Sequence, residues 1–279
     1  MTDSLLQQAM HPDTLDSSWR RLRSEHTPWS VSTDRDQLAQ HTIRHLLECR
    51  DQVLSGVYRP EPLRQFTMKK PDGRQRVLSA QHLKDKWLQR ALLIVLEPRA
   101  EALFHNDSYA YRPARGVEQA IGKVRERVRV GMDWLVDTDI QSFFDAIPHK
   151  PLIKVLESFI KDRATMKLIR QWLQQGCHRT SLLGTRRGIS QGAILSPLFC
   201  NLYLHSFDQS LSRQNIPFVR YADDFLLFAD TKANAGAALD FARIEIENLA
   251  LQLHPKKTRC VRSGPEVVFL GKPLPHPSR

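Results

Sequence analysis

The chain has 279 residues, of which 41% are hydrophobic, so it is long enough for one large domain or two packed subdomains with a true core. This composition argues against disorder over most of the length. Lys and Arg outnumber Asp and Glu by 41 to 30, which gives a formal charge of +11 and favours a polyanionic partner such as nucleic acid. Another kind of basic soluble protein would have the same charge, so the motifs must decide.

The four cysteines lie far apart and form no CxxC pair, which indicates neither a zinc site nor a disulfide framework. Cys177 and His178 are adjacent but have no partner pair, so we expect ordinary packing or a surface position for them. The N-terminus shows neither a basic start with an apolar core nor an apolar run of membrane length. We therefore expect a cytoplasmic protein.

The N-terminal part is expected to be helical, because residues 14–55 place apolar side chains at helical spacing before Gly56. Two strand-like runs then surround Pro71-Asp72-Gly73, a turn sequence with a preset proline angle and a permissive glycine. This predicts a β-hairpin near 65–79. Between residues 59 and 90 the chain carries nine basic and three acidic residues, so the hairpin is a candidate for facing phosphate groups.

Two later segments combine apolar strands with acids. WLVDTDI, at 134–140, is typical of a buried strand that ends in carboxylates, and FVRYADDFLLFA, at 218–229, predicts two strands interrupted by two aspartates. Helical patterns are expected at 82–96, 117–130, 150–159, 164–175, 193–211 and 233–251, and short strands at 259–262 and 267–270. No internal repeat or flexible linker is evident.

The acids carry the chemistry. Asp223 and Asp224 have apolar neighbours on both sides, and unpaired buried carboxylates are costly, so the pair needs cations unless it is a solvated turn. Asp139 also ends an apolar strand, and three carboxylates at neighbouring strand ends predict a site for two Mg²⁺ ions, with Mn²⁺ as a substitute. Such ions activate a 3′-hydroxyl and stabilise the leaving pyrophosphate. The predicted reaction is nucleotidyl transfer.

Seven segments follow one another in a specific order: KKPDGRQRVLS, SYAYRPARGVEQAI, DTDIQSFFDAIPH, GISQGAILSPLFCNLYL, RYADDFLLFA, LHPKKTR and FLGKPL. In these segments, which span most of the chain, the sequence resembles the bacterial reverse transcriptases of the group II intron type. The resemblance implies an α+β fold, the right-hand polymerase with fingers and a palm built on an antiparallel sheet. It places largely helical fingers with the basic hairpin at about 1–130 and the palm, with the acidic triad, at 131–279, and part of the fingers is expected to interleave with the palm.

The resemblance also implies roles for single residues in the palm. Asp139, Asp223 and Asp224 take the catalytic, metal-binding positions, and the carbonyl of Ile140 is a further ligand. Lys257 resembles a palm lysine proposed to protonate pyrophosphate, although the adjacent Lys256 leaves that assignment open.

Other residues are implied in nucleotide binding. Lys70 and Arg76 match fingers residues that grip the triphosphate, and Gln191 with Gly192 matches a turn beside the incoming nucleotide. Phe144 matches the aromatic residue that excludes a 2′-hydroxyl. The alternative is that Phe143 and Phe144 are both core residues. We expect one of them to be core and the other to face the nucleotide, because neighbouring side chains of a strand point to opposite faces.

Four further basic residues are implied in contacts with nucleic acid. Lys69 and Arg74 belong to the basic hairpin. Arg112 and Arg115 lie in a segment that runs near the template in the family, with a solvated loop as the alternative.

Two features depart from the family pattern. Ser190 stands where a proline commonly precedes the Gln of the turn, which is expected to loosen the turn without removing the chemistry. The chain ends at Arg279, soon after FLGKPL, so we expect little or no thumb and a protein or structured-RNA partner that replaces it. The combined motifs look most like the group II-derived enzymes associated with CRISPR spacer acquisition, an antiviral defence.

The predicted function is RNA-templated synthesis of DNA from a DNA or RNA primer and dNTPs. Two alternatives remain. An untemplated or protein-primed polymerase in phage defence would share every catalytic residue. A non-polymerising, maturase-like RNA-binding protein would keep the basic surface but would have no need for three metal-seeking carboxylates.

Overall fold

The computed structural model describes residues 3–69, 75–176, 178–179 and 185–277. Its contacts divide the chain into two compact units. The first unit comprises Met1–Ala102 and Pro148–Phe199, and the second comprises Leu103–Ile147 and Cys200–Arg279. Each unit is therefore made of two stretches of the chain.

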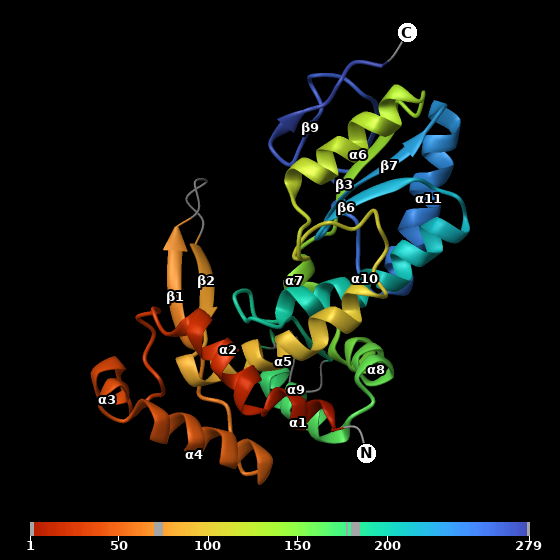
Figure 1. Ribbon diagram of the computed structural model, residues 1–279. Coiled ribbons are helices and arrows are strands. Elements are labelled where there is room, and N and C mark those ends of the chain that lie inside the picture. Colours follow the sequence, from red (N-terminus) through yellow and green to blue (C-terminus); the bar gives the residue numbers. More distant parts are fainter. Residues whose placement is uncertain (1–2, 70–74, 177, 180–184, 278–279) are drawn as a thin grey trace. The chain divides into compact units, whose positions relative to one another are not determined.

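The second unit is built on a four-stranded antiparallel sheet with the strand order β6-β7-β3-β8 (Figure 1). These strands are β3 (Trp134–Asp139), β6 (Phe218–Tyr221), β7 (Asp224–Ala229) and β8 (Arg259–Arg262). The pairing of β3 with β7 runs from Trp134 opposite Ala229 to Asp139 opposite Asp224. This register brings the acidic strand ends together.

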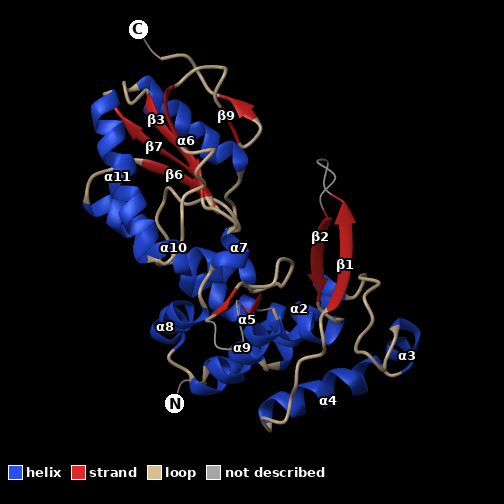
Figure 2. Ribbon diagram, turned by 180° about the vertical axis from the view of Figure 1, so that it is seen from behind, coloured by secondary structure: helices blue, strands red, loops and turns tan. Residues whose placement is uncertain are grey.

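Helices cover both faces of this sheet (Figures 1 and 2). The helix α6 (Val117–Arg129) has an apolar stripe at helical spacing, and this stripe packs in one core with Leu135, Leu226 and Phe228 of the sheet. On the other face, α11 (Lys232–Asn248) packs along β3, β7 and β8, and α10 (Ser196–Arg213) places the ring of Phe207 5.2 Å from that of Phe225. The short hairpin of β9 (Val268–Phe269) and β10 (Lys272–Pro273) adds Phe269 to the α6 core.

The first unit is largely helical and is organised around α5 (Leu83–Glu101), which buries Leu83, Trp87, Leu88, Ala91, Leu92 and Leu96. Trp87 of this helix donates its indole N–H to the carbonyl of Leu15 at 3.0 Å. Its other helices are α1 (Leu5–Ala9), α2 (Pro12–Leu22), α3 (Arg35–Gln40), α4 (Thr42–Leu54), α8 (His149–Ile160) and α9 (Arg163–Gln175). The short helix α7 (Phe143–Ala146) belongs to the second unit. The first unit also holds the hairpin of β1 (Arg64–Lys69) and β2 (Gln75–Ala80) and the short pair β4 (His178–Arg179) and β5 (Arg186–Arg187).

The expected α+β class with an antiparallel sheet is confirmed, and so is the hairpin near 65–79, although its turn at 71–73 lies outside the described residues. The helix expected at 82–96 continues to Glu101, with Pro98 inside it. Cys177 is also outside the described residues. No described helix is long and apolar enough to span a membrane.

Candidate active site

A cavity of about 570 Å³ opens at the acidic end of the sheet in the second unit. The strands β3 and β7 and the segment before β8 supply its walls. It is lined by Asp137, Thr138, Asp139, Asp223, Asp224, Lys256, Lys257, Arg259 and Val268. Four carboxylates and three cationic side chains therefore face one space, which suits charged, phosphate-bearing ligands.

Asp139 and Asp224 are directly opposite each other on β3 and β7. Side chains at directly opposite positions lie on the same face of a sheet, and two like charges there repel each other. Asp137 lies two residues before Asp139 and so shares its face. The sheet therefore gathers negative charge that folding alone does not require.

Asp223 lies in the two-residue turn between β6 and β7. The first turn residue, Ala222, has a left-handed backbone with φ +60°, a conformation that disfavours side chains other than glycine, asparagine and aspartate. The carbonyl of Asp223 accepts a hydrogen bond from the N–H of Ile140 at 3.1 Å, which ties this turn to the end of β3. Strained turns of this kind persist where surrounding contacts hold them.

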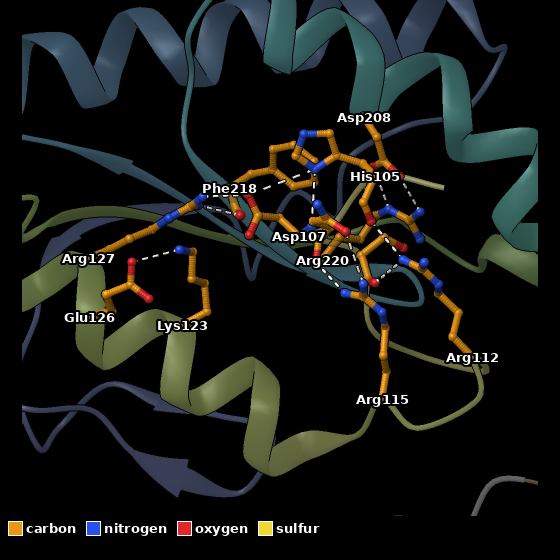
Figure 3. A network of polar contacts seen from close by, with 12 residues as sticks. His105, Asp107, Arg112, Arg115, Lys123, Glu126, Arg127, Asp208, Phe218 and Arg220 are labelled. Carbon is orange, nitrogen blue, oxygen red and sulfur yellow. Dashed lines mark hydrogen bonds and ion pairs between the residues drawn. The ribbon is translucent and has the colours of Figure 1, made fainter. Parts of the chain in front are cut away.

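Arg220 supplies such a contact (Figure 3). Its side chain is fully buried, and it donates to both carboxylate oxygens of Asp208, at 2.7 and 2.5 Å. The third guanidinium nitrogen donates to Oδ1 of Asn201 at 3.1 Å and to the carbonyl of Ala222 at 3.0 Å. One end of the strained turn is thereby fixed to α10 through a rigid planar fork.

Lys257, in the segment before β8, contacts one of the acids directly. Its ammonium donates to Oδ2 of Asp139, and its side chain is 62% exposed. The segment that carries Lys257 is held in place because the N–H of His254 donates to the carbonyl of Asp139 at 2.8 Å. Arg259 binds Asp137 in the same way, through two nitrogens at 2.9 and 2.7 Å.

The electrostatics of the cluster favour added positive charge. Burial, together with the neighbouring charges of Asp137, Asp139 and Asp223, raises the pKa of Asp224 to about 7. Burial also raises the pKa of Asp223, with a smaller contribution from Asp139. The hydrogen bond to Asp139 raises the pKa of Lys257, so its ammonium stays charged. A cation near the acids would reverse the repulsion between them.

The donor set fits a hard divalent cation, which prefers oxygen ligands and carboxylates in particular. Oδ1 of Asp139 is buried and accepts no hydrogen bond from any described group. Within the described residues, however, no group of three or more His, Cys, Asp and Glu side chains is arranged so that it could hold a metal ion. Since Lys257 engages Oδ2 of Asp139, metal binding there would require this exposed side chain to move.

Comparisons with known proteins agree on one family. The family described as reverse transcriptase (RNA-dependent DNA polymerase) matches residues 68–274. This chain belongs to the reverse transcriptase family. The expected enzyme class, an RNA-directed DNA polymerase, is confirmed at the level of this family.

The relatives include proteins of the group II intron type. The chain is 30% identical to protein YkfC of Escherichia coli (strain K12), over 90% of this chain and 77% of that protein. It is 33% identical to the group II intron-encoded protein LtrA of Lactococcus lactis subsp. cremoris, over 66% of this chain and only 31% of LtrA. Its fold is similar to a chain in a Cas6-RT-Cas1–Cas2 complex, with a TM-score of 0.52 and 24% identity over 90% of this chain and 44% of that one.

In this reverse transcriptase, the two adjacent phenylalanines differ in burial as expected, but for another reason. Phe143 is 2% exposed and Phe144 is half-buried, with their ring centroids 5.8 Å apart. Both lie on the single turn of α7, not on a strand, so strand alternation does not explain the difference. The turn of helix directs the two side chains apart.

The expected nucleotide-binding residues other than Phe144 and Lys257 belong to the first unit. Gly192 has φ +109°, where a side chain would be strained, and a Cβ there would lie 3.5 Å from the carbonyl oxygen of Ser79 in β2. The turn of Gln191 and Gly192 thus packs beside the hairpin. Lys69 and Arg76 lie on the two hairpin strands, whereas Lys70 and Arg74 are outside the described residues.

Arg112 has a structural position that does not favour its expected contact with template. It is 7% exposed and donates to the carbonyls of His105 and Ser108, at 2.7 and 2.6 Å. Arg115 is half-buried and donates to the carbonyl and side chain of Asn106, at 2.5 and 3.0 Å (Figure 3). Of this pair, Arg115 is the more accessible to solvent.

Sequence reasoning missed several residues of this region. Asp137 could have been found from its spacing, because it shares a strand face with Asp139. Arg220 could have been suspected, because a charge inside an apolar strand must be paired when buried. Its partners Asp208 and Asn201 had no such signal, since nothing in the helical pattern of α10 sets them apart from its other polar residues.

Proposed function

We propose that this chain is an RNA-templated DNA polymerase that extends a DNA or RNA primer with dNTPs. The observation that carries the proposal is the acidic cavity, in which Asp223 and Asp224, whose pKa values are raised, lie beside Asp139 with its unsatisfied buried oxygen. The family match supplies the template and product class. Two Mg²⁺ ions, or Mn²⁺ in their place, would activate the 3′-hydroxyl and stabilise the pyrophosphate leaving group.

Asp139, Asp223 and Asp224 are the proposed metal-binding residues, with the carbonyl of Ile140 as a further ligand. The protein contributes rigid placement. The register of β3 and β7 sets Asp139 against Asp224, and Arg220 fixes the turn that carries Asp223. Lys257 is the proposed proton donor to pyrophosphate, because its ammonium stays charged and its stem is free to leave Asp139.

The first unit is proposed to bind the nucleotide and template. Arg76, with Lys70, would contact the triphosphate, and Gln191 with Gly192 would line the path of the base, where glycine allows close backbone approach. Lys69 and Arg74 would contact the nucleic acid backbone. In the second unit, Phe144 would discriminate against a 2′-hydroxyl.

Primer extension with purified protein tests the function. A single RNA template of defined sequence is supplied with a DNA primer, Mg²⁺ and dNTPs, and the products are sequenced. Complementary products support the proposal. Homopolymeric or random products would favour the untemplated alternative, and RNA binding without any product would favour a maturase-like binder.

We further propose that the cDNA serves CRISPR spacer acquisition. The residues and the order of the sequence motifs support membership of the CRISPR-associated group of these enzymes. The likeness to the Cas6-RT-Cas1–Cas2 complex is a likeness of fold alone. The test is co-purification with a CRISPR integrase encoded nearby. We place the activity in the cytoplasm, since the described cysteines Cys49, Cys200 and Cys260 are free thiols.

A further inference from the structure

The helices α8 and α9 of the first unit carry an unusual excess of positive charge. Residues 149–175 include six Lys and Arg and only two acids. All six cationic residues are exposed: Lys150, Lys154, Lys161, Arg163, Lys167 and Arg170. We call these six residues the α8–α9 basic surface.

Five of the six cations lie on one face of their helix, and Lys161 follows the C-terminal end of α8. Lys150 and Lys154 are four residues apart on α8, and Arg163, Lys167 and Arg170 recur at spacings of four and three on α9. The opposite faces are core, with Leu152 and Leu156 of α8 and Ile169 and Leu173 of α9 buried. Each helix thus presents a cationic stripe to solvent.

The two stripes are adjacent. Arg170 of α9 forms an ion pair with Glu157 of α8, and Glu157 lies on the same face as Lys150 and Lys154. The other acid, Asp162, accepts hydrogen bonds from the N–H groups of Ala164, Thr165 and Leu6. Neither acid is therefore available to the remaining five cations, which have no ion pair within the described residues.

This arrangement is unfavourable for the isolated fold. Lys150–Lys154 and Arg163–Lys167 are like charges at i,i+4, which repel. Lys150 and Arg163 also lie in the first turns of their helices, where the positive end of the helix disfavours a cation. Lys161 adopts a left-handed backbone, φ 51°, at a C-terminal position where glycine or asparagine is usual. A polyanion would relieve the first two of these costs.

The residue types on this surface indicate which kind of polyanion it binds. Single-stranded nucleic acid is usually held by aromatic side chains on which bases stack. The aromatic residues of this segment do not provide such a platform, because His149 and Trp172 are buried and Phe159 is half-buried. Cations without stacking partners contact phosphates and recognise shape more than sequence.

We propose that the α8–α9 basic surface binds the phosphate backbone of base-paired RNA. This proposal rests on the proposed function, since it assumes that the chain works on RNA. It assigns an RNA-binding role to two helices that have no role in the proposed polymerase chemistry. The bound RNA is a double-helical segment of the template or of a structured RNA that carries it.

The test compares two triple variants that remove the same charge. Lys150→Gln/Lys154→Gln/Arg163→Gln removes three unpaired cations from the surface. Arg21→Gln/Arg125→Gln/Arg129→Gln removes three exposed cations that also have no ion pair within the described ranges. Affinity for a blunt RNA duplex, for single-stranded RNA and for anionic lipid vesicles is measured by fluorescence anisotropy or co-sedimentation, with salt varied between about 50 and 200 mM.

We expect the surface variant alone to lose affinity for duplex RNA, by at least about tenfold, and its salt slope to fall by about 2 to 3, or 0.7 to 0.9 for each lost contact. Its thermal stability should be equal to wild type or higher, because repulsion is removed. A Lys150→Arg/Lys154→Arg variant should bind like wild type. Equal losses in both triple variants, a larger loss for single strands, or a loss for vesicles alone would overturn the proposal.

Primer extension on an unstructured template separates this proposal from the proposed function. Wild-type extension together with unchanged duplex binding in the surface variant would refute only the RNA surface. If the wild type extends no primer while the surface variant alone loses affinity for duplex RNA, the polymerase would be refuted and the surface supported.

Discussion

Arg220 and Asp208 are both fully buried and are joined by two parallel hydrogen bonds, from Nε to Oδ1 at 2.7 Å and from a terminal nitrogen to Oδ2 at 2.5 Å. The same guanidinium holds the carbonyl of Ala222 in the turn beside Asp223. Because a buried pair must be fully bonded to persist, the position of the acidic turn depends on this pair.

We predict that Asp208→Ala lowers the free energy of unfolding by about 3 to 5 kcal/mol, because it leaves an uncompensated buried charge. Denaturant unfolding measures the change. The control is Asp240→Ala, which breaks an exposed ion pair with Arg243 and should cost less than about 1 kcal/mol. Equal effects of the two variants would contradict the account.

Arg220→Lys keeps the charge but loses the planar fork, so the carbonyl of Ala222 should be held less firmly. We predict a fall in kcat of about tenfold or more, with little change in RNA affinity. Ala222→Gly removes the penalty of the left-handed backbone and should restore part of kcat in the Arg220→Lys background. If glycine restores melting temperature but no kcat, Arg220 contributes stability and not positioning.

Removing one carboxylate should stabilise the protein in EDTA. The pKa of Asp224 is raised above its unfolded value, to about 7, so its ionisation destabilises the fold as pH rises from about 4 to about 7. We predict that Asp224→Asn raises the melting temperature in EDTA, more at pH 8 than at pH 5. Added Mg²⁺ should raise the melting temperature of the wild type more than that of the variant; the same response in both would count against a metal at Asp224.

Lys257 and a metal ion would compete for Oδ2 of Asp139. We therefore predict that Lys257→Ala lowers the Mg²⁺ concentration needed for half-maximal activity, while kcat falls about 100-fold or more if Lys257 donates the proton. Lys256→Ala is the matched control and should change neither quantity much. The opposite ranking of the two lysines would move the proposed role to Lys256.

The two phenylalanines of α7 should separate function from stability. Phe144→Ala, or the smaller change to Val, should raise ribonucleotide incorporation, because the half-buried ring is the proposed barrier to a 2′-hydroxyl. Phe143→Ala should lower the free energy of unfolding by about 3 to 5 kcal/mol, since that ring is core. An unaltered ratio of dNTP to rNTP incorporation in the Phe144 variants would show that the selectivity arises elsewhere.

Local patterns predicted much of the sheet and of the acid cluster. Apolar runs that end in carboxylates predicted β3, β6 and β7, because strands and buried charges both have strong sequence signals. The difference in burial between Phe143 and Phe144 was predicted for the wrong reason. Both residues lie on a single helical turn after a strand, which is too short for its periodicity to be detected in the sequence. The partnership of Arg220 with Asp208 and Asn201 was not predictable, because it joins a strand to a helix through tertiary packing.

The most direct test of the central claim is single-turnover incorporation of one dNTP on an RNA template, with wild type, Asp223→Asn and Asp240→Asn compared at equal RNA occupancy. We predict that Asp223→Asn binds RNA like wild type but incorporates almost nothing, whereas Asp240→Asn, outside the cavity, behaves like wild type. Substantial incorporation by Asp223→Asn would contradict the assignment of the chemistry to this acidic cavity.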